Sequence, residues 1–149
     1  MSSDAYSYIL NENLSKCDIK GECFRNAVRR ANEIDGEIID KQRSAGVKGK
    51  IETDVLVVHG MITNPLSKKT FAHGWVERDG KVIDPTIQVE MNVRNYYRKF
   101  SVDVLAKYTT DQAMVHSITT RNYGPWTKGE VGSKSVVFLK SLDERMDRM

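Results

Sequence analysis

The stretch from Phe71 to Thr86 reads FAHGWVERDGKVIDPT and predicts a β-hairpin. Two short apolar runs flank Asp79-Gly80, a dipeptide favoured in tight hairpin turns because both residues tolerate a positive φ. The first strand is therefore expected from Phe71 to Arg78, and the second from Lys81 to Asp84.

The two faces of this hairpin carry different chemistry. Side chains alternate along a strand, so one face of the first strand is expected to carry Phe71, His73, Trp75 and Glu77, and the other Ala72, Gly74 and Val76. Counted from the turn, His73 and Asp84 are diagonal neighbours, which is within reach of an aromatic side chain. An imidazole oriented by a carboxylate is suited to act as a general base.

A nucleophile for such a base is available upstream, at Cys23. A helix is expected from Cys23, with Phe24, Ala27, Val28 and Ala31 along one face and Gly36 as a stop signal, although residues 37–40 can extend it. A thiol at a helix N-terminus lies near the positive end of the macrodipole, which stabilises the thiolate. The N–H groups there can also accept an oxyanion. A free cysteine taken alone is more often a small buried hydrophobe.

The rest of the chain predicts one α+β domain over residues 1–149, with N-terminal helices packed on an antiparallel sheet. The expected elements are a helix at Ser3–Leu14, a polar loop at Gln42–Glu52, a buried strand at Val55–Ile62, a loop at Thr63–Thr70 and a strand at Ser135–Leu139. A further helix is expected from about Thr110, its N-cap, with Ala113, Met114 and Ile118 on the inner side and an end at Asn122–Trp126. The stretch after Thr86 has no clear period.

Composition narrows the classes of function. The 149 residues are 40% hydrophobic and 29% charged, as in an ordinary globular domain, and the net charge of +3 is too small and too mixed to indicate nucleic acid. We find no membrane span and no leader segment, so a cytoplasmic location is expected. One bridge between Cys17 and Cys23 would consume the nucleophile; because nothing indicates secretion, free thiols are expected.

Other chemistry is less well supported by the sequence. His59, at a strand end, is the rival base, and His116 is the least promising. Cys17, Cys23, His59 and His73 do not have the paired spacing of a zinc site, and no glycine-rich phosphate loop follows a strand, so no metal and no cofactor are expected. Residues 96–99 can contact a nucleic acid, but such aromatic clusters are more often core, and residues 123–126 can line a cleft or simply pack at a helix end.

Four short motifs, in order, resemble the transglutaminase-like branch of the papain-like cysteine enzymes. They are CFRNA at 23–27, VVHG at 57–60, AHGWVE at 72–77 and VIDPT at 82–86. The resemblance implies a papain-like topology in which Cys23 is the nucleophile, His73 the base and Asp84 the residue that orients it. Gly74 stands where the family often has Ala, which fits a small-residue position. The family's upstream oxyanion side chain has no clear match here; Asn11 and Asn13 are candidates only by type and position.

The resemblance implies acyl transfer at an amide bond of a protein or peptide. Resolution of the thioester by water gives a peptidase, isopeptidase or deamidase, and resolution by an amine gives a transglutaminase. The small size of the domain favours hydrolysis. The alternative is a non-catalytic protein- or peptide-binding module on the same fold. The sequence gives no indication of oligomeric state.

Overall fold

The structure is an α+β fold built on a five-stranded antiparallel sheet, as the sequence predicts. A computed structural model of the chain describes residues 22–124 and residue 126. The described elements are α2 (Glu22–Ser44), β1 (Leu56–Thr63), β2 (Thr70–Arg78), β3 (Lys81–Asp84), β4 (Val89–Asn92), α3 (Val93–Lys99), β5 (Asp103–Thr109) and α4 (Thr110–Thr120). The expected helix at Ser3–Leu14 and the expected strand at Ser135–Leu139 lie outside the described residues.

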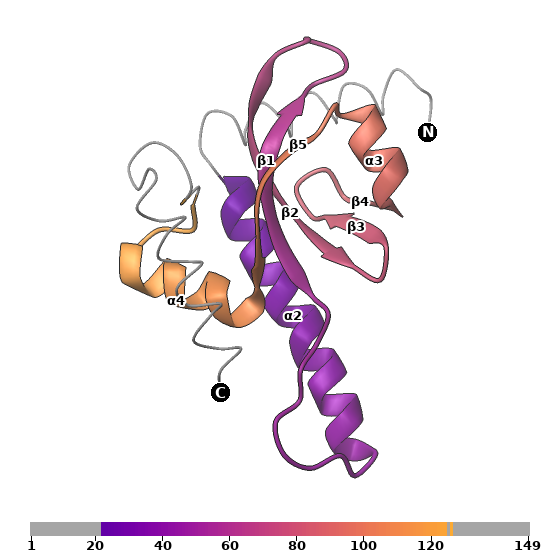
Figure 1. The fold of residues 1–149 in the computed structure, drawn as a ribbon, viewed down its shortest axis with the longest axis vertical. Helices are drawn as coiled ribbons and strands as arrows, with labels where there is room; N and C mark the ends of the chain where they lie inside the picture. The colour runs from indigo at the N-terminus through magenta and orange to yellow at the C-terminus, as the bar shows by residue number, and fades with distance from the viewer. Residues whose placement is uncertain (1–21, 125, 127–149) are drawn as a thin grey trace.

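The sheet has the strand order β4-β3-β2-β1-β5, and each neighbouring pair is antiparallel. β1 is the buried strand that the apolar run predicts; it lies between β2 and β5 and pairs with β2 over its whole length. Figure 1 shows α2 and α4 toward one side of this sheet and α3 toward the other. The sheet is therefore covered on both faces, which explains why β1 carries a nearly continuous run of apolar residues.

The predicted hairpin is confirmed. β2 and β3 pair through Val76↔Ile83, Glu77↔Val82 and Arg78↔Lys81. At the turn, Asp79 has φ 52° and Gly80 has φ 72°, the two positive values that a two-residue type I′ turn requires. The turn thus fixes the register that brings the end of β3 beside the middle of β2.

Two hydrophobic cores lie on the sheet. We call the first the Trp75 core; its buried members are Cys23, Phe24, Val58, Ile62, Phe71, Trp75, Val82, Ile87, Tyr96 and Phe100. We call the second the Trp126 core; its buried members are Ala27, Val28, Ala31, Ile34, Val55, Val57, Val76, Tyr108, Ala113 and Trp126. Alternation along β1 and β2 separates the two, since Val58 and Trp75 belong to one core and Val57 and Val76 to the other.

Gly36 does not end the first described helix: the extension through residues 37–40, which the sequence also allows, is present, and α2 continues to Ser44. A glycine in a helix interior costs only about 1 kcal/mol relative to alanine, which packing readily offsets. Ile34 is buried in the Trp126 core and Ile38 packs against it, so the apolar face continues across the glycine. Consequently residues 42–44 are helical rather than part of the expected loop.

The expected inner side of α4 is also partly wrong. Its N-cap is Thr109, one residue earlier than expected, in a capping box with Gln112. Ala113 is buried as expected, but Met114 and Ile118 are 40% and 70% exposed. The buried positions include Gln112 and His116 instead, because the capping box and the stacking of His116 on Trp126, at 4.9 Å between ring centroids, set the rotation of the helix.

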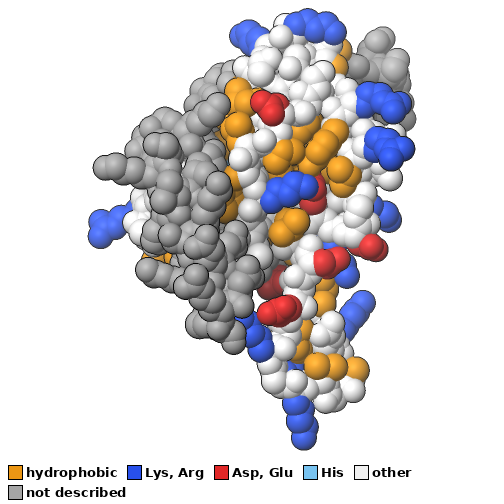
Figure 2. Space-filling model, in the orientation of Figure 1, with side chains coloured by type: hydrophobic (Ala, Val, Ile, Leu, Met, Phe, Trp, Pro, Cys, Tyr) orange, Lys and Arg blue, Asp and Glu red, His pale blue; other side chains and the backbone are white. Residues whose placement is uncertain are grey.

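The surface agrees with the mixed charge pattern. Figure 2 shows the Lys and Arg side chains spread over the visible face rather than gathered into one patch. Among the helices that the structure describes, none combines the length and the apolar character that crossing a membrane requires.

The close contact between β1 and β2 at Gly60 gives a first prediction. A Cβ on Gly60 would lie 2.8 Å from Cη2 of Trp75 and 2.7 Å from the carbonyl oxygen of Asp103. Gly60→Ala is therefore expected to lower the free energy of unfolding by about 1–3 kcal/mol, as overpacking of a core does. Chemical denaturation followed by tryptophan fluorescence measures it.

The matched control is Gly36→Ala, where a Cβ would meet no described atom within 4 Å. Because Gly36 is inside α2, this variant is expected to raise the free energy of unfolding by about 0.5–1 kcal/mol. Equal effects of the two substitutions would contradict the packing of Trp75 over Gly60.

Candidate catalytic site

His73 and Asp84 form a buried pair at the point where β3 ends. Nε2 of His73 lies 2.7 Å from Oδ2 of Asp84, and both side chains are completely buried. Since Val76 pairs with Ile83, the register places Asp84 opposite Trp75, two residues from His73 on the same face. The diagonal contact that the hairpin predicts is therefore present.

The Asp84 carboxylate is surrounded by hydrogen-bond donors. Oδ2 accepts from the Tyr96 hydroxyl at 2.7 Å as well as from His73. Oδ1 accepts from the backbone N–H groups of Thr86 at 3.0 Å and Ile87 at 3.4 Å. An ionised carboxylate can only accept hydrogen bonds, so we assign the hydrogen of this contact to Nε2 of His73.

Burial fixes the protonation of Tyr96. The pKa of its hydroxyl is raised well above the ordinary value, chiefly by burial and further by the neighbouring Asp84 carboxylate. Tyr96 therefore keeps its proton and acts as a donor to Asp84. The sequence places Tyr96 in an aromatic cluster but does not indicate this role, because only the folding of α3 onto the sheet brings it to Asp84.

The imidazole of His73 is held by its neighbours on β2. Its ring centroid lies 6.0 Å from Trp75, in a stacked arrangement, and 6.2 Å from Phe71. Trp75 is anchored in turn, since its Nε1 donates to Oε2 of Glu77 at 2.9 Å. Glu77 also accepts from the Tyr97 hydroxyl and, at 2.9 Å, from Nζ of Lys107. Stacking and these hydrogen bonds restrict rotation of the ring.

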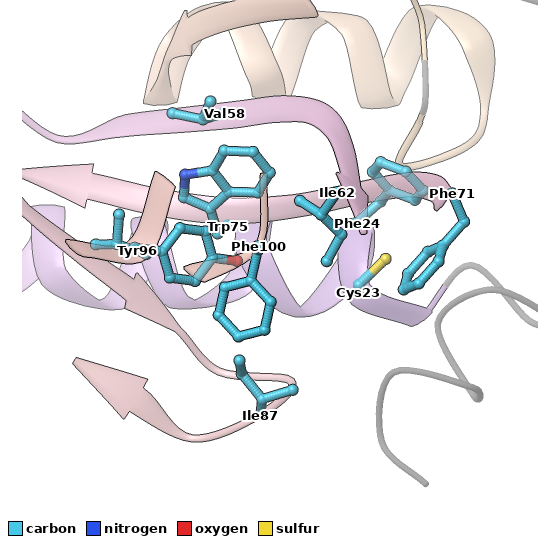
Figure 3. Close-up of a cluster of buried hydrophobic side chains, with 10 residues drawn as sticks. Cys23, Phe24, Val58, Ile62, Phe71, Trp75, Ile87, Tyr96 and Phe100 are labelled. Carbon is cyan, nitrogen blue, oxygen red and sulfur yellow. The ribbon is translucent and has the colours of Figure 1, made fainter. Parts of the chain in front are cut away.

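Cys23 lies in the first turn of α2 and is completely buried in the Trp75 core. Figure 3 shows it at one end of that core, beside Phe24, Ile62 and Phe71. Asn26, three residues on along α2, donates from Nδ2 to Oγ1 of Thr86 at 3.3 Å. Residues three apart lie on the same side of a helix. Because Thr86 is bonded to Asp84, this contact joins the first turns of α2 to the end of β3.

The expectation that Cys23 is a free thiol is wrong. Cys23 is disulfide-bonded, and the sequence contains one other cysteine, Cys17, which lies outside the described residues. Free thiols were expected because nothing in the sequence indicates secretion. That observation concerns the cellular compartment and does not exclude a disulfide in the folded chain. A disulfide sulfur is not a nucleophile, so this form of the protein cannot use Cys23 for attack.

His59, the rival base, occupies the opposite face of the sheet from His73. In β1 it pairs with Gly74, and its ring contacts Phe24, Tyr108 and Trp126 at 4.8–5.1 Å between centroids. Neither ring nitrogen has a hydrogen-bond partner among the described residues. Burial first, then the nearby His116 and His73, lowers the pKa of His59 to about 3. Within the described part of the chain, His59 is thus a neutral core residue with no carboxylate to orient it.

The remaining expectations concern the small residue at position 74, a zinc site, and the residues considered for a cleft or for the oxyanion. A Cβ on Gly74 would lie 3.0 Å from Cδ1 of Phe24, so the small-residue interpretation is consistent with the close approach of α2. The opposed faces of His59 and His73 separate two of the four residues considered for zinc, and the described part of the chain has no group of three or more potential metal ligands. Trp126 packs in the core, while Asn11 and Asn13 lie outside the described residues.

Comparisons of the chain with protein-family models, with curated proteins and with solved structures found no match. The chemistry of the site therefore has to follow from its residues and their geometry.

The environment of His59 predicts how stability depends on pH. In the folded protein His59 stays neutral down to about pH 3, whereas in the unfolded chain it takes up a proton near the ordinary histidine pKa of 6.5. The unfolded state thus binds the additional proton, so the free energy of unfolding falls as the pH decreases from 6.5 towards 3. Above pH 6.5 this residue contributes no pH dependence. Urea unfolding at a series of pH values measures the slope.

The variant His59→Leu keeps an apolar side chain of similar volume and removes the titrating group. We expect it to reduce the pH slope in that window and to leave a smaller slope of the same sign from His116, whose pKa burial also lowers. An unchanged slope in His59→Leu would exclude His59 as the source.

Proposed function

We propose that the reduced form of this protein is a cysteine-dependent acyl-transfer enzyme that acts on an amide bond of a protein or peptide, on a papain-like, transglutaminase-like fold. The observation that carries the proposal is the buried His73–Asp84 pair, with the first turns of α2 joined to it through Asn26 and Thr86. The proposal uses three groups: the imidazole of His73 as base, the carboxylate of Asp84 that orients it, and Cys23 in the first turn of α2. This is the set of groups that nucleophilic catalysis at a carbonyl requires.

The reaction begins with proton transfer from the thiol of Cys23 to Nδ1 of His73. The thiolate attacks the carbonyl carbon, a C–S bond forms, and the carbonyl electrons move to oxygen. As the tetrahedral intermediate collapses, the C–N bond breaks and the imidazolium of His73 protonates the leaving amine. Water, or a second amine, then attacks the thioester, and His73 removes its proton and returns one to the sulfur.

The beginning of α2 is suited to stabilise the oxyanion. The first N–H groups of a helix have no intrahelical acceptor, and the helix dipole favours negative charge there. Because Cys23 is in the first turn, these donors are close to the carbonyl carbon that its sulfur would attack. The same donors would serve hydrolysis and transfer to an amine alike, since both pass through a tetrahedral oxyanion.

Two conditions must be met before this chemistry can occur. The disulfide at Cys23 must be reduced, and the completely buried sulfur must become accessible. Asp84 can remain buried during catalysis, but one edge of the completely buried His73 imidazole must become accessible together with the sulfur, since both meet the substrate. The described form is therefore interpreted as an oxidised resting form.

The second candidate is a non-catalytic protein- or peptide-binding module. The disulfide and the burial of all three residues favour it, since a disulfide and a fully bonded buried carboxylate can stabilise a fold without taking part in any reaction. The two candidates differ in whether Cys23 is required for turnover, and this difference can be measured.

Turnover of amide and thioester peptides by the reduced protein tests the proposal. Cys23→Ala is expected to lower the rate by about 10³-fold or more, because the nucleophile is lost. Cys17→Ala is the matched control and is expected to keep the activity. A rate that survives unchanged in Cys23→Ala, or no turnover by the reduced wild type, would favour the binding module.

The redox state supplies a second test. We expect wild-type activity, and alkylation of Cys23 mapped by mass spectrometry, to appear only after treatment with a reductant, since the disulfide blocks the sulfur. The Cys17→Ala protein lacks the second cysteine of the chain and is expected to be active and alkylated without reductant. Equal wild-type activity in oxidising and reducing buffer would contradict this assignment.

A further inference from the structure

We infer that Tyr96 is a positioning residue of this site: its hydroxyl holds the Asp84 carboxylate in the orientation that aligns His73. The inference depends on the proposed function and deepens it, because it adds a fourth residue to the three that the sequence indicates. Tyr96 touches neither the sulfur nor the substrate in the proposed mechanism. It acts through Asp84.

The geometry places Tyr96 and His73 on the same oxygen atom. The Tyr96 hydroxyl and Nε2 of His73 each lie 2.7 Å from Oδ2 of Asp84. The backbone N–H groups of Thr86 and Ile87 are bonded to Oδ1. The loop after β3 therefore holds one oxygen, and Tyr96 holds the other. Without the Tyr96 hydroxyl, the contact with His73 would be the remaining hydrogen bond to Oδ2 from the described residues.

The position of Tyr96 is fixed independently of that bond. It is completely buried in α3, and its ring packs 5.4 Å from Trp75 and 4.8 Å from Phe100 between centroids. The N-terminus of α3 is capped by the side chain of Asn92, which accepts from the N–H of Arg94 at 2.8 Å. The hydroxyl thus approaches Asp84 from a separate, well-packed element, whereas His73 approaches it from β2.

The function of such a donor follows from the charge on Asp84. A buried carboxylate is stable only if its oxygens accept hydrogen bonds, and each donor favours the ionised over the protonated form. An ionised Asp84 can only accept, which keeps the hydrogen of His73 on Nε2 and leaves Nδ1 to take the proton of the thiol. Loss of the Tyr96 donor leaves the orientation of the Asp84 carboxylate, and with it that of the His73 ring, less defined.

Tyr96→Phe tests the role, with Tyr108→Phe as the matched control. Both remove one buried hydroxyl, but that of Tyr108 has no hydrogen-bond partner among the described residues and lies in the Trp126 core. In Tyr96→Phe we expect kcat on a peptide amide to fall about tenfold with KM unchanged, the effect of losing one charge-assisted hydrogen bond. Tyr108→Phe should stay within about twofold of wild type in kcat, since its hydroxyl does not contact Asp84.

Each outcome decides the inference. A wild-type kcat in Tyr96→Phe, or equal losses of kcat in the two variants, would overturn it while leaving the proposed function intact. Absence of any turnover that depends on Cys23 in the wild type would instead refute the proposed function, and the positioning role with it. If Tyr96→Phe does not fold, NMR of the wild type decides: slowly exchanging hydroxyl and imidazole protons close to each other support the shared acceptor, and their absence overturns it.

Discussion

The structure depends on the hydrogen bonds made to the buried carboxylate of Asp84. Removing an ionised carboxylate from water is costly, and it is tolerated only when its oxygens are hydrogen-bonded. Here the donors come from three separate parts of the chain: His73 on β2, Tyr96 on α3, and the backbone at Thr86 and Ile87 after β3. The strand register, the packing of α3 and the course of the loop must therefore all be correct at once. A second buried carboxylate, Glu77, makes a similar demand through Trp75, Tyr97 and Lys107.

Two buried histidines on neighbouring strands of the sheet have different surroundings. His73 and His59 are both completely buried, and they lie on adjacent strands one register position apart. His73 faces Asp84, whereas His59 faces the rings of Phe24, Tyr108 and Trp126. Alternation along the strands decides this, since a shift of one residue would exchange the faces. Environment rather than residue type thus distinguishes the candidate base from a core residue.

Local signals in the sequence were enough for the hairpin and for the His73–Asp84 contact. Asp79-Gly80 sets the turn, and counting outward from it gives the diagonal pair. The region after Thr86 has no clear period because three short elements, β4, α3 and β5, follow one another there with four, seven and seven residues, and the pattern changes from strand to helix and back. Tyr96 was missed for that reason. The inner face of α4 was misjudged because a ring contact with Trp126 sets it, and no local pattern encodes that contact.

The disulfide at Cys23 blocks the proposed chemistry but takes no part in the hydrogen bonds around Asp84. None of the donors to Asp84 among the described residues comes from Cys23, so the hydrogen bonds that hold this carboxylate do not require a thiolate. Among these donors, the imidazole of His73 is the group that can also take up a proton and so act as a base. This property, together with the link from α2 to Thr86 through Asn26, supports the proposal of an enzyme controlled by oxidation. The disulfide and the complete burial of Cys23, His73 and Asp84 support instead a scaffold that the bridge stabilises.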